Sequence, residues 1–172
     1  MKSALIITGK NVQDHEFIYP FYRLQESGFK VEVATDKMAE VTGQLGAAKV
    51  IPTLDIENLN PDQFHLLLLP GGAKCMEYIR QDQRVINFIK EFNSTGKIIG
   101  SICHAAQLLI SAKIVKGRRI SGYYSLKDDI ENAGAIYTDE PVVVDKNIIS
   151  TAHYKHMGPW MKEVCESALI QK

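Results

Sequence analysis

The sequence predicts an α/β fold in which helices cover both faces of a mainly parallel sheet. Short runs rich in Ile, Val and Leu alternate with helical patterns along the chain, which is typical of parallel strands joined by helices. Neither an internal repeat nor a linker interrupts the 172 residues, and a chain of this length suits one core. We therefore expect a single domain spanning residues 1–172.

The first elements follow from apolar patterns that are bounded by glycine. Residues 4–8 (ALIIT) predict a strand, and residues 14–27 predict a helix with one apolar side that stops at Gly28. Residues 30–35 (KVEVAT) predict a second strand. Residues 41–53 contain two glycines and a proline, which favours a small accessory hairpin over a helix.

The middle of the chain repeats the alternation of strand and helix. Residues 65–69 (HLLLL) predict a strand buried on both faces, and a Pro-Gly-Gly turn ends it. Residues 82–93 predict a helix with an apolar face, and residues 97–102 (KIIGSI) predict the next central strand. A further helix is expected over residues 105–112.

The last third of the chain predicts two strands and a closing helix. Residues 142–144 and 147–151 are apolar runs, and the two residues between them suit a tight turn. The closing helix is expected to place five apolar residues on its inner face: Met157, Met161, Val164, Ala168 and Leu169.

The composition argues against nucleic-acid and membrane partners. Lys plus Arg and Asp plus Glu both number 20, and no basic stripe stands out. No apolar run approaches the roughly 18 residues of a membrane span, and the first ten residues lack the features of a signal peptide. Three cysteines without CxxC spacing favour free thiols in a reducing compartment. We expect a cytoplasmic protein with a small-molecule substrate, and the zero net charge is compatible with a homo-oligomer.

Cys103 is the strongest candidate for a reactive residue. The segment GSICHAA over residues 100–106 runs directly from a buried strand into a helix, which is the arrangement of a nucleophile elbow. Unpaired N–H groups at a helix start favour the thiolate, and the N–H of His104 is placed to stabilise an oxyanion. The alternative interpretation is a small buried cysteine without chemistry.

Two other segments are expected at the same edge of the sheet as Cys103. Gly71 and Gly72 end the neighbouring strand, so their backbone N–H groups are candidates for the rest of an oxyanion hole. Glu16 lies in the first turn of the helix after the first strand, which opens onto that edge in a doubly wound sheet. A buried, protonated carboxyl there would donate to a thiolate or move a proton. The alternatives are a simple turn and an acid that interacts with the helix dipole.

Several motifs, in order along the chain, resemble the ThiJ/PfpI family of cysteine proteins. They are EFIYPFYRL at 16–24, PGG at 70–72, SICH at 101–104, QLLISA at 107–112, LKDDIENAGA at 126–135 and EPVVVD at 140–145. The resemblance covers nearly the whole chain. It implies a flavodoxin-like three-layer α/β/α sandwich of the class I glutamine amidotransferase-like superfamily, without a cofactor, whose reactive cysteine is hydrogen-bonded by the carboxyl at position 16.

The resemblance also implies a range of activities. Members are described as intracellular proteases, as cofactor-independent glyoxalases or deglycases, and as stress-response proteins. In the protease-like branch a glutamate of a neighbouring subunit completes a Cys-His-Glu set, and Glu77 matches that position. This chain departs from that branch after the last strand, where TAHYKHM at 151–157 replaces the usual Ser-Arg-x-Pro-x-Asp-Leu and is more similar to the corresponding segment of glyoxalase-like relatives.

Three hypotheses for function follow. In the first, Cys103 attacks a small reactive carbonyl or acyl group while Glu16 or His104 moves protons. In the second, the same site acts as a peptidase or amidase that needs Glu77 of a neighbouring subunit. In the third, the protein is a redox-sensing stress-response protein or a chaperone that acts through oxidation of Cys103 beside Glu16.

The remaining histidines, aromatic residues and cysteines carry weaker expectations. His153 follows a strand and Tyr123 follows a glycine break, so both are candidates to line the pocket. His153 and His156 lack the helical spacing and the third ligand of a zinc site, and we expect no metal. Cys75 lies near the glycine turn and is a candidate for oxidation, whereas Cys165 is expected in the core.

Overall fold

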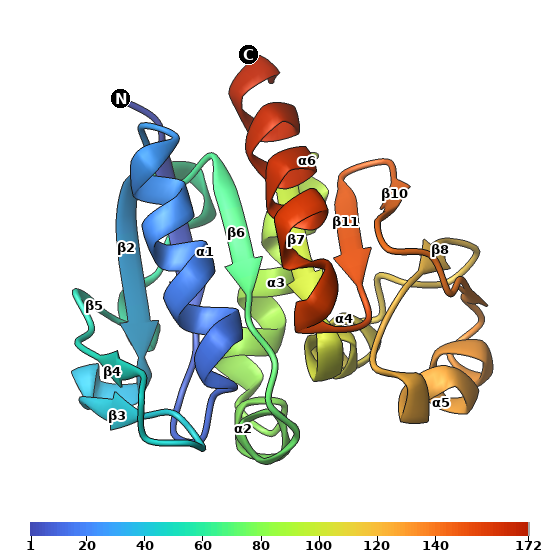
Figure 1. Cartoon of the computed structure of the whole chain (residues 1–172), viewed down its shortest axis with the longest axis horizontal. Helices are drawn as coiled ribbons and strands as arrows, with labels where there is room; N and C mark the ends of the chain where they lie inside the picture. Colours follow the sequence, from blue (N-terminus) through green and yellow to red (C-terminus); the bar gives the residue numbers. More distant parts are fainter. Residues whose placement is uncertain (172) are drawn as a thin grey trace.

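The central feature of the computed structural model is a seven-stranded sheet with the order β10-β11-β7-β6-β1-β2-β5 (Figure 1). The structure describes residues 1–171. The strands of this sheet are β1 (Ser3–Ile7), β2 (Lys30–Thr35), β5 (Leu54–Asp55), β6 (Leu66–Leu69), β7 (Ile98–Ile102), β10 (Val143–Asp145) and β11 (Ile148–Thr151). All neighbours are parallel except β10 and β11, so the prediction of a mainly parallel sheet is confirmed.

Helices form a layer on each face of this sheet. The front layer in Figure 1 contains α1 (Asp14–Glu26) and α6 (Met157–Ile170), which contact each other. The rear layer contains α2 (Ala73–Ile79), α3 (Gln83–Ser94) and α4 (Ala106–Ser111). The predicted three-layer α/β/α sandwich is therefore confirmed.

Smaller elements surround the sandwich. The predicted hairpin is confirmed as the antiparallel pair β3 (Val41–Thr42) and β4 (Lys49–Val50). The parallel pair β8 (Arg119–Ile120) and β9 (Ile136–Tyr137) accompanies α5 (Lys127–Asn132) at one side of the molecule. Short 3₁₀ helices are η1 (Asp36–Met38), η2 (Ile56–Asn58), η3 (Pro61–Gln63), η4 (Cys103–Ala105), η5 (Tyr124–Leu126) and η6 (Tyr154–His156).

The core is apolar and closely packed on both faces of the sheet. All four leucines of β6 are fully buried, as the apolar run predicted. Trp160 of α6 is also fully buried, and its Nε1 donates to the backbone oxygen of Ile149 at 3.0 Å. A side chain at Gly100 of β7 would meet Trp160 and Val164 at 3.3 Å, so the absence of one lets α6 lie close to the sheet.

The strand order brings three segments together at one edge of the sheet. The chain moves from β1 to β2 in one direction, and later from β6 to β7 in the other. The carboxyl ends of β1, β6 and β7 are therefore neighbours at a topological switch point, where open α/β sheets bind ligands. The segments that follow these strands contain Glu16, Gly71, Gly72 and Cys103.

The two ends of the described chain meet at the opposite edge of the sheet. Lys2 Nζ donates to the backbone oxygens of Ala168 at 2.8 Å and Leu169 at 3.0 Å, and also to that of Gln171. Figure 1 shows the first residues and the end of α6 at the same end of the molecule, with the arrowheads of the strands at the other. Lys2 thus satisfies backbone oxygens that the end of a helix leaves unpaired.

Some details differ from the sequence-based expectations. Leu169, expected on the inner face of α6, is 45% exposed, because it lies on the outer side of the helix's last turn. The elements β5, α2, α5, β8 and β9 were not predicted; each has two to seven residues. Among residues 1–171, none of the helices has the length and apolarity that crossing a bilayer requires.

Candidate active site

Cys103 lies on a sharp turn directly after β7, at the start of η4. Its φ is 60°, in the left-handed region that a residue with a side chain rarely adopts, at a cost on the order of 1–3 kcal/mol. The N–H of Tyr123 donates to the backbone oxygen of Cys103 at 3.0 Å and holds this conformation. The structure therefore contains the strained elbow that presents a nucleophile.

The sulfur of Cys103 lies among hydrogen-bonding groups from three segments. His104 Nδ1 is 3.2 Å from Sγ, and the backbone N–H groups of His104 and Gly72 also interact with the sulfur. The carboxyl of Glu16 is the third neighbour. Cys103 is 7% exposed and lines the adjacent pocket, so a small molecule in this pocket can contact the thiol.

Glu16 is a fully buried carboxyl at the first turn of α1. Its Oε2 accepts a hydrogen bond from the N–H of Gly71 at 2.8 Å, while its Oε1 has no hydrogen-bond partner within residues 1–171. Burial raises the pKa of Glu16 to about 7, although the bonds with Gly71 and Cys103 act in the opposite direction. This carboxyl can therefore hold and release a proton near neutral pH.

The thiol of Cys103 is less acidic than its place at the start of a helix predicted. Burial and the nearby charge of Glu16 raise the pKa of Cys103, and the N–H groups of His104 and Gly72 only partly offset them. The expectation of a thiolate favoured by a helix dipole is thus wrong, because η4 is a short 3₁₀ turn and burial dominates. Cys103 and Glu16 form a coupled pair: the thiol loses its proton most easily when Glu16 carries one.

The two glycines after β6 have different roles. Gly72, with a φ of 104°, turns its N–H toward the sulfur, as an oxyanion donor requires. The expectation that Gly71 also donates to an oxyanion needs correction, because its N–H already donates to Glu16. A Cβ at Gly71 would lie 2.5 Å from Glu16 Oε2 and 2.8 Å from the backbone oxygen of Ile102. Gly71 is therefore what lets the carboxyl and the elbow approach each other.

Replacing Gly71 with alanine should lower the free energy of unfolding by about 1–3 kcal/mol, because the added methyl overpacks the contact between Glu16 and the elbow. Denaturant unfolding of the two proteins measures the difference. The control is Gly158→Ala in α6, where a Cβ meets nothing within 4 Å and stability should hold or rise slightly. Equal stability of Gly71→Ala and the unmodified protein would contradict the geometry.

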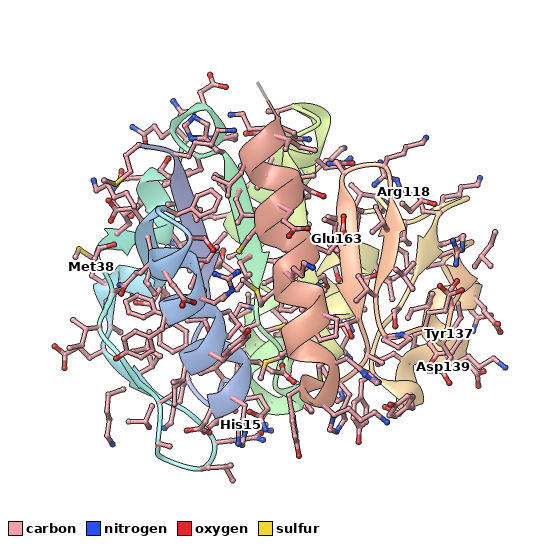
Figure 2. The ribbon with its side chains drawn as sticks, turned by 45° about the horizontal axis from the view of Figure 1, so that its top comes forward. His15, Met38, Arg118, Tyr137, Asp139 and Glu163 are labelled. Atoms are coloured by element: carbon pink, nitrogen blue, oxygen red, sulfur yellow. The ribbon has the colours of Figure 1, made fainter. Side chains whose placement is uncertain are left out.

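A pocket of about 390 Å³ opens above Cys103 and Glu16. His153 and Tyr123, predicted as pocket residues, both line it. The other lining residues are Gln13, His15, Gln44, Leu45, Gly72, Ala73, His104 and Tyr154. His15, labelled in Figure 2, lies in the first turn of α1 and is one of these lining residues.

Aromatic rings form one wall of this pocket. The rings of His104 and Tyr123 stack with centroids 4.6 Å apart, and those of His153 and Tyr154 are 4.1 Å apart. His15 stacks on the other side of Tyr154 at 4.9 Å. Five rings from four separate segments thus stabilise each other along the lining of the pocket, beginning beside the thiol at His104.

The side chains that line the pocket are mostly neutral at neutral pH. Burial lowers the pKa of His104, and burial together with Lys155 and His156 lowers the pKa of His153. Glu16 keeps its proton up to about pH 7, and within the part of the chain that the structure describes no Lys, Arg or Asp lines the pocket. The pocket therefore suits an uncharged reacting group better than an anion.

A second, larger cavity of about 510 Å³ lies on the other side of residues 8–11 and does not include Cys103. We assign the site to the smaller pocket, because it contains the thiol and the buried carboxyl. Cys75 lines the larger cavity but is fully buried, and burial raises its pKa to about 12. The expectation that Cys75 responds to oxidants is therefore not supported.

The pocket lining differs from the sequence-based expectations at several residues. Glu77 is exposed on α2, pairs with Lys74 at 2.8 Å and does not line the pocket of its own chain, so its role in a neighbouring subunit stays a prediction. Gln13, Gln44 and Leu45 line the pocket but were not predicted to, since no chemical motif marks them. Within residues 1–171 no three His, Cys, Asp or Glu side chains are grouped as metal ligands would be.

Together, the sandwich and its site define a flavodoxin-like protein with a cysteine on an elbow beside a buried carboxyl. The chain belongs to the DJ-1/PfpI family, whose model matches residues 2–167. It is 41% identical over 160 residues to a deglycase of Pyrococcus abyssi (93% of this chain, 95% of the relative). It is 37% identical over 153 residues to protein/nucleic acid deglycase 2 of Escherichia coli (88% and 87%).

The solved structures agree with this assignment. A two-domain protein of Anabaena variabilis, with DJ-1/ThiJ/PfpI-like and ferritin-like domains, superposes with a TM-score of 0.94 at 27% identity. The match covers 96% of this chain and 48% of that protein, so this chain spans about half its length.

Proposed function

We propose that this protein is a cofactor-independent glyoxalase or deglycase that converts an α-oxoaldehyde, free or released from its adducts with amines and thiols, into a hydroxy acid. The observation that carries the proposal is the Cys103–Glu16 pair: a thiol on an elbow against a buried carboxyl whose pKa is about 7. The similarity to relatives named deglycases supports the same class of reaction.

The geometry accommodates each step of this chemistry. The ionised carboxylate of Glu16 takes the thiol proton as the sulfur of Cys103 adds to the aldehyde carbon, and the N–H groups of Gly72 and His104 stabilise the resulting oxyanion. Glu16 passes this proton to the oxyanion, which gives a hemithioacetal and leaves the carboxylate ionised. Glu16 then takes the proton from the same carbon and returns it to the neighbouring carbon, while the hydroxyl proton moves to the neighbouring oxygen; a pKa near 7 suits transfer in both directions. The acyl thioester then reacts with water to give the hydroxy acid and the free thiol. The overall reaction consumes one water molecule and needs no external oxidant or reductant.

The peptidase hypothesis has less support. It requires Glu77 of a neighbouring subunit beside His104, whereas Glu77 is engaged with Lys74 in this chain. The proposed reaction needs only Cys103, Glu16 and backbone donors, all of which one chain supplies. A peptide substrate therefore serves as the contrasting arm of the test.

The test is a substrate panel with the purified protein. Free methylglyoxal and its adducts with N-acetylarginine and N-acetylcysteine should yield lactate, and the adducts should also yield the free carrier, faster than in buffer. A casein-derived peptide should not be cleaved. Lactate formation at the uncatalysed rate from all three carbonyl substrates would refute the proposal, and peptide cleavage would favour the peptidase.

A further inference from the structure

The hairpin β3–β4 contributes part of the pocket lining. Gln44 and Leu45, in the loop of this hairpin, line the pocket, and Leu45 is 66% exposed. An apolar side chain with this much exposure at a pocket mouth is available to contact a ligand. The exposed ring of Tyr154 lines the same pocket.

The carboxylate of Asp14 fixes the loop of this hairpin to α1. Its Oδ2 accepts a hydrogen bond from the N–H of Leu45 at 2.7 Å, and its Oδ1 accepts one from the N–H of Ala48 at 2.6 Å. Asp14 is only 2% exposed. Bonds from backbone N–H groups to a buried carboxylate are among the stronger hydrogen bonds in proteins.

The loop is built around this carboxylate. A Cβ at Gly43 would lie between 2.3 and 2.6 Å from the carboxyl atoms of Asp14, so only glycine lets the loop close over it. Burial would raise the pKa of Asp14, but the N–H groups of Ala48, Leu45 and Ala47 outweigh it and hold this pKa below its usual value. The carboxylate of Asp14 therefore stays ionised at neutral pH.

The pocket divides into an inner and an outer part. The inner part contains Cys103, Glu16 and Gly72, where an aldehyde would react. A pocket of about 390 Å³ is in the size range that holds drug-sized ligands, so a three-carbon aldehyde fills only part of it. The outer part is the exposed end of the lining, which includes Leu45 and Tyr154, and is where the amine or thiol that carries an adduct would lie.

We propose that Asp14 is a positioning residue that holds Leu45 as the outer wall of the pocket and so sets the affinity for substrates with a bulky carrier group. The proposal rests on the function proposed above. Asp14 itself does not line the pocket, so its effect is exerted through the hairpin. Loosening the hairpin should weaken binding of a carrier while leaving the reaction at the inner part intact.

Two variants should weaken the contact between Asp14 and the hairpin, one by changing the carboxylate and the other by changing the loop. Asp14→Asn keeps the shape but places an amide NH₂ against a backbone N–H, and Gly43→Ala pushes the loop off an intact Asp14. Both should raise KM for the N-acetylarginine adduct about tenfold and change KM for free methylglyoxal less than twofold, with kcat nearly constant. The control Asp82→Asn removes a helix-capping acid at α3, outside the pocket, and should leave both KM values unchanged.

A second measurement does not depend on turnover. A bulky fluorescein maleimide should label Cys103 about tenfold faster in both variants than in the unmodified protein, while iodoacetamide should react at similar rates in all three. KM and labelling rates within twofold of the unmodified protein in both variants would overturn the proposal. If the unmodified protein turns over no carbonyl substrate, the proposed function fails, and the labelling rates alone decide on Asp14.

Discussion

Replacing Cys103 with serine should lower kcat/KM for methylglyoxal by about 10³-fold or more, which is the scale on which loss of a nucleophile acts. Serine fits the same space, but its hydroxyl does not ionise near neutral pH. His104 lies beside this position, but burial lowers its pKa and makes it a weak base for a hydroxyl that is much less acidic than a thiol. Initial rates of lactate formation measure the loss.

The matched control for this variant is Cys165→Ala. Cys165 is buried in α6, outside the pocket, so its loss should cost some stability and leave kcat/KM unchanged. If Cys103→Ser keeps a tenth or more of the activity, or if the two cysteine variants lose activity equally, Cys103 is not the nucleophile. Thermal unfolding of each variant separates a loss of chemistry from a loss of fold.

Replacing Glu16 with glutamine should have the second largest effect and should separate activity from stability. Glutamine keeps an oxygen for the N–H of Gly71 but cannot exchange protons. We expect kcat to fall by about 10²–10⁴-fold, the range of general acid–base catalysis. The control is Glu163→Gln. Glu163, labelled in Figure 2, lies on α6 and accepts a hydrogen bond from Ser167, so its replacement should leave kcat unchanged.

Although Glu16→Gln should be less active, its folding stability relative to the unmodified protein should increase with pH. The native protein holds the proton of Glu16 up to about pH 7, whereas the unfolded chain loses it near 4.5, so folding stability falls as pH rises between these values. The rise in the pKa of Glu16 corresponds to a loss of about 3 kcal/mol in the free energy of unfolding of the unmodified protein over this pH range. The glutamine variant has no proton to lose at this position and is spared that loss. Relative to the unmodified protein, Glu16→Gln should therefore gain stability from pH 5 to pH 8.

Denaturant unfolding at several pH values measures this gain. A constant difference between the two proteins from pH 5 to pH 8 would show that the pKa of Glu16 is not raised. An active Glu16→Gln variant would show instead that another group moves the proton. The two readouts thus test the electrostatics and the chemistry of Glu16 separately.

The sharp turn at Cys103 could be predicted from the sequence because such a turn between a strand and a helix is a local feature. A buried strand, small neighbours and a following helix all lie within residues 98–111. Glu16 could be placed beside Cys103 because the carboxyl ends of parallel strands share one edge of the sheet. Both inferences use only the order of strands and helices.

The properties that depend on distant packing could not be predicted. The sign of the shift in the pKa of Cys103 depends on burial by segments that follow three different strands, and the helix-dipole argument therefore gave the wrong direction. The left-handed φ of Cys103 carries no glycine signal in the sequence. Asp14 resembles an ordinary acid at a helix start, since its partners lie 31 and 34 residues away.

Short elements were missed for a related reason. The seven residues of α2 and the two-residue strands β8 and β9 carry too few residues for a periodic pattern to emerge. Such segments are stabilised by tertiary contacts rather than by their own propensity. The elements α2, β8 and β9 could therefore be recognised only in the folded structure.

The contact between Lys2 and the end of α6 places both ends of the described chain on the face of the molecule opposite the pocket. A tag, a linker or a solid support joined at either end would therefore emerge away from Cys103. The protein can be immobilised or fused through its ends with the mouth of the pocket open to solution.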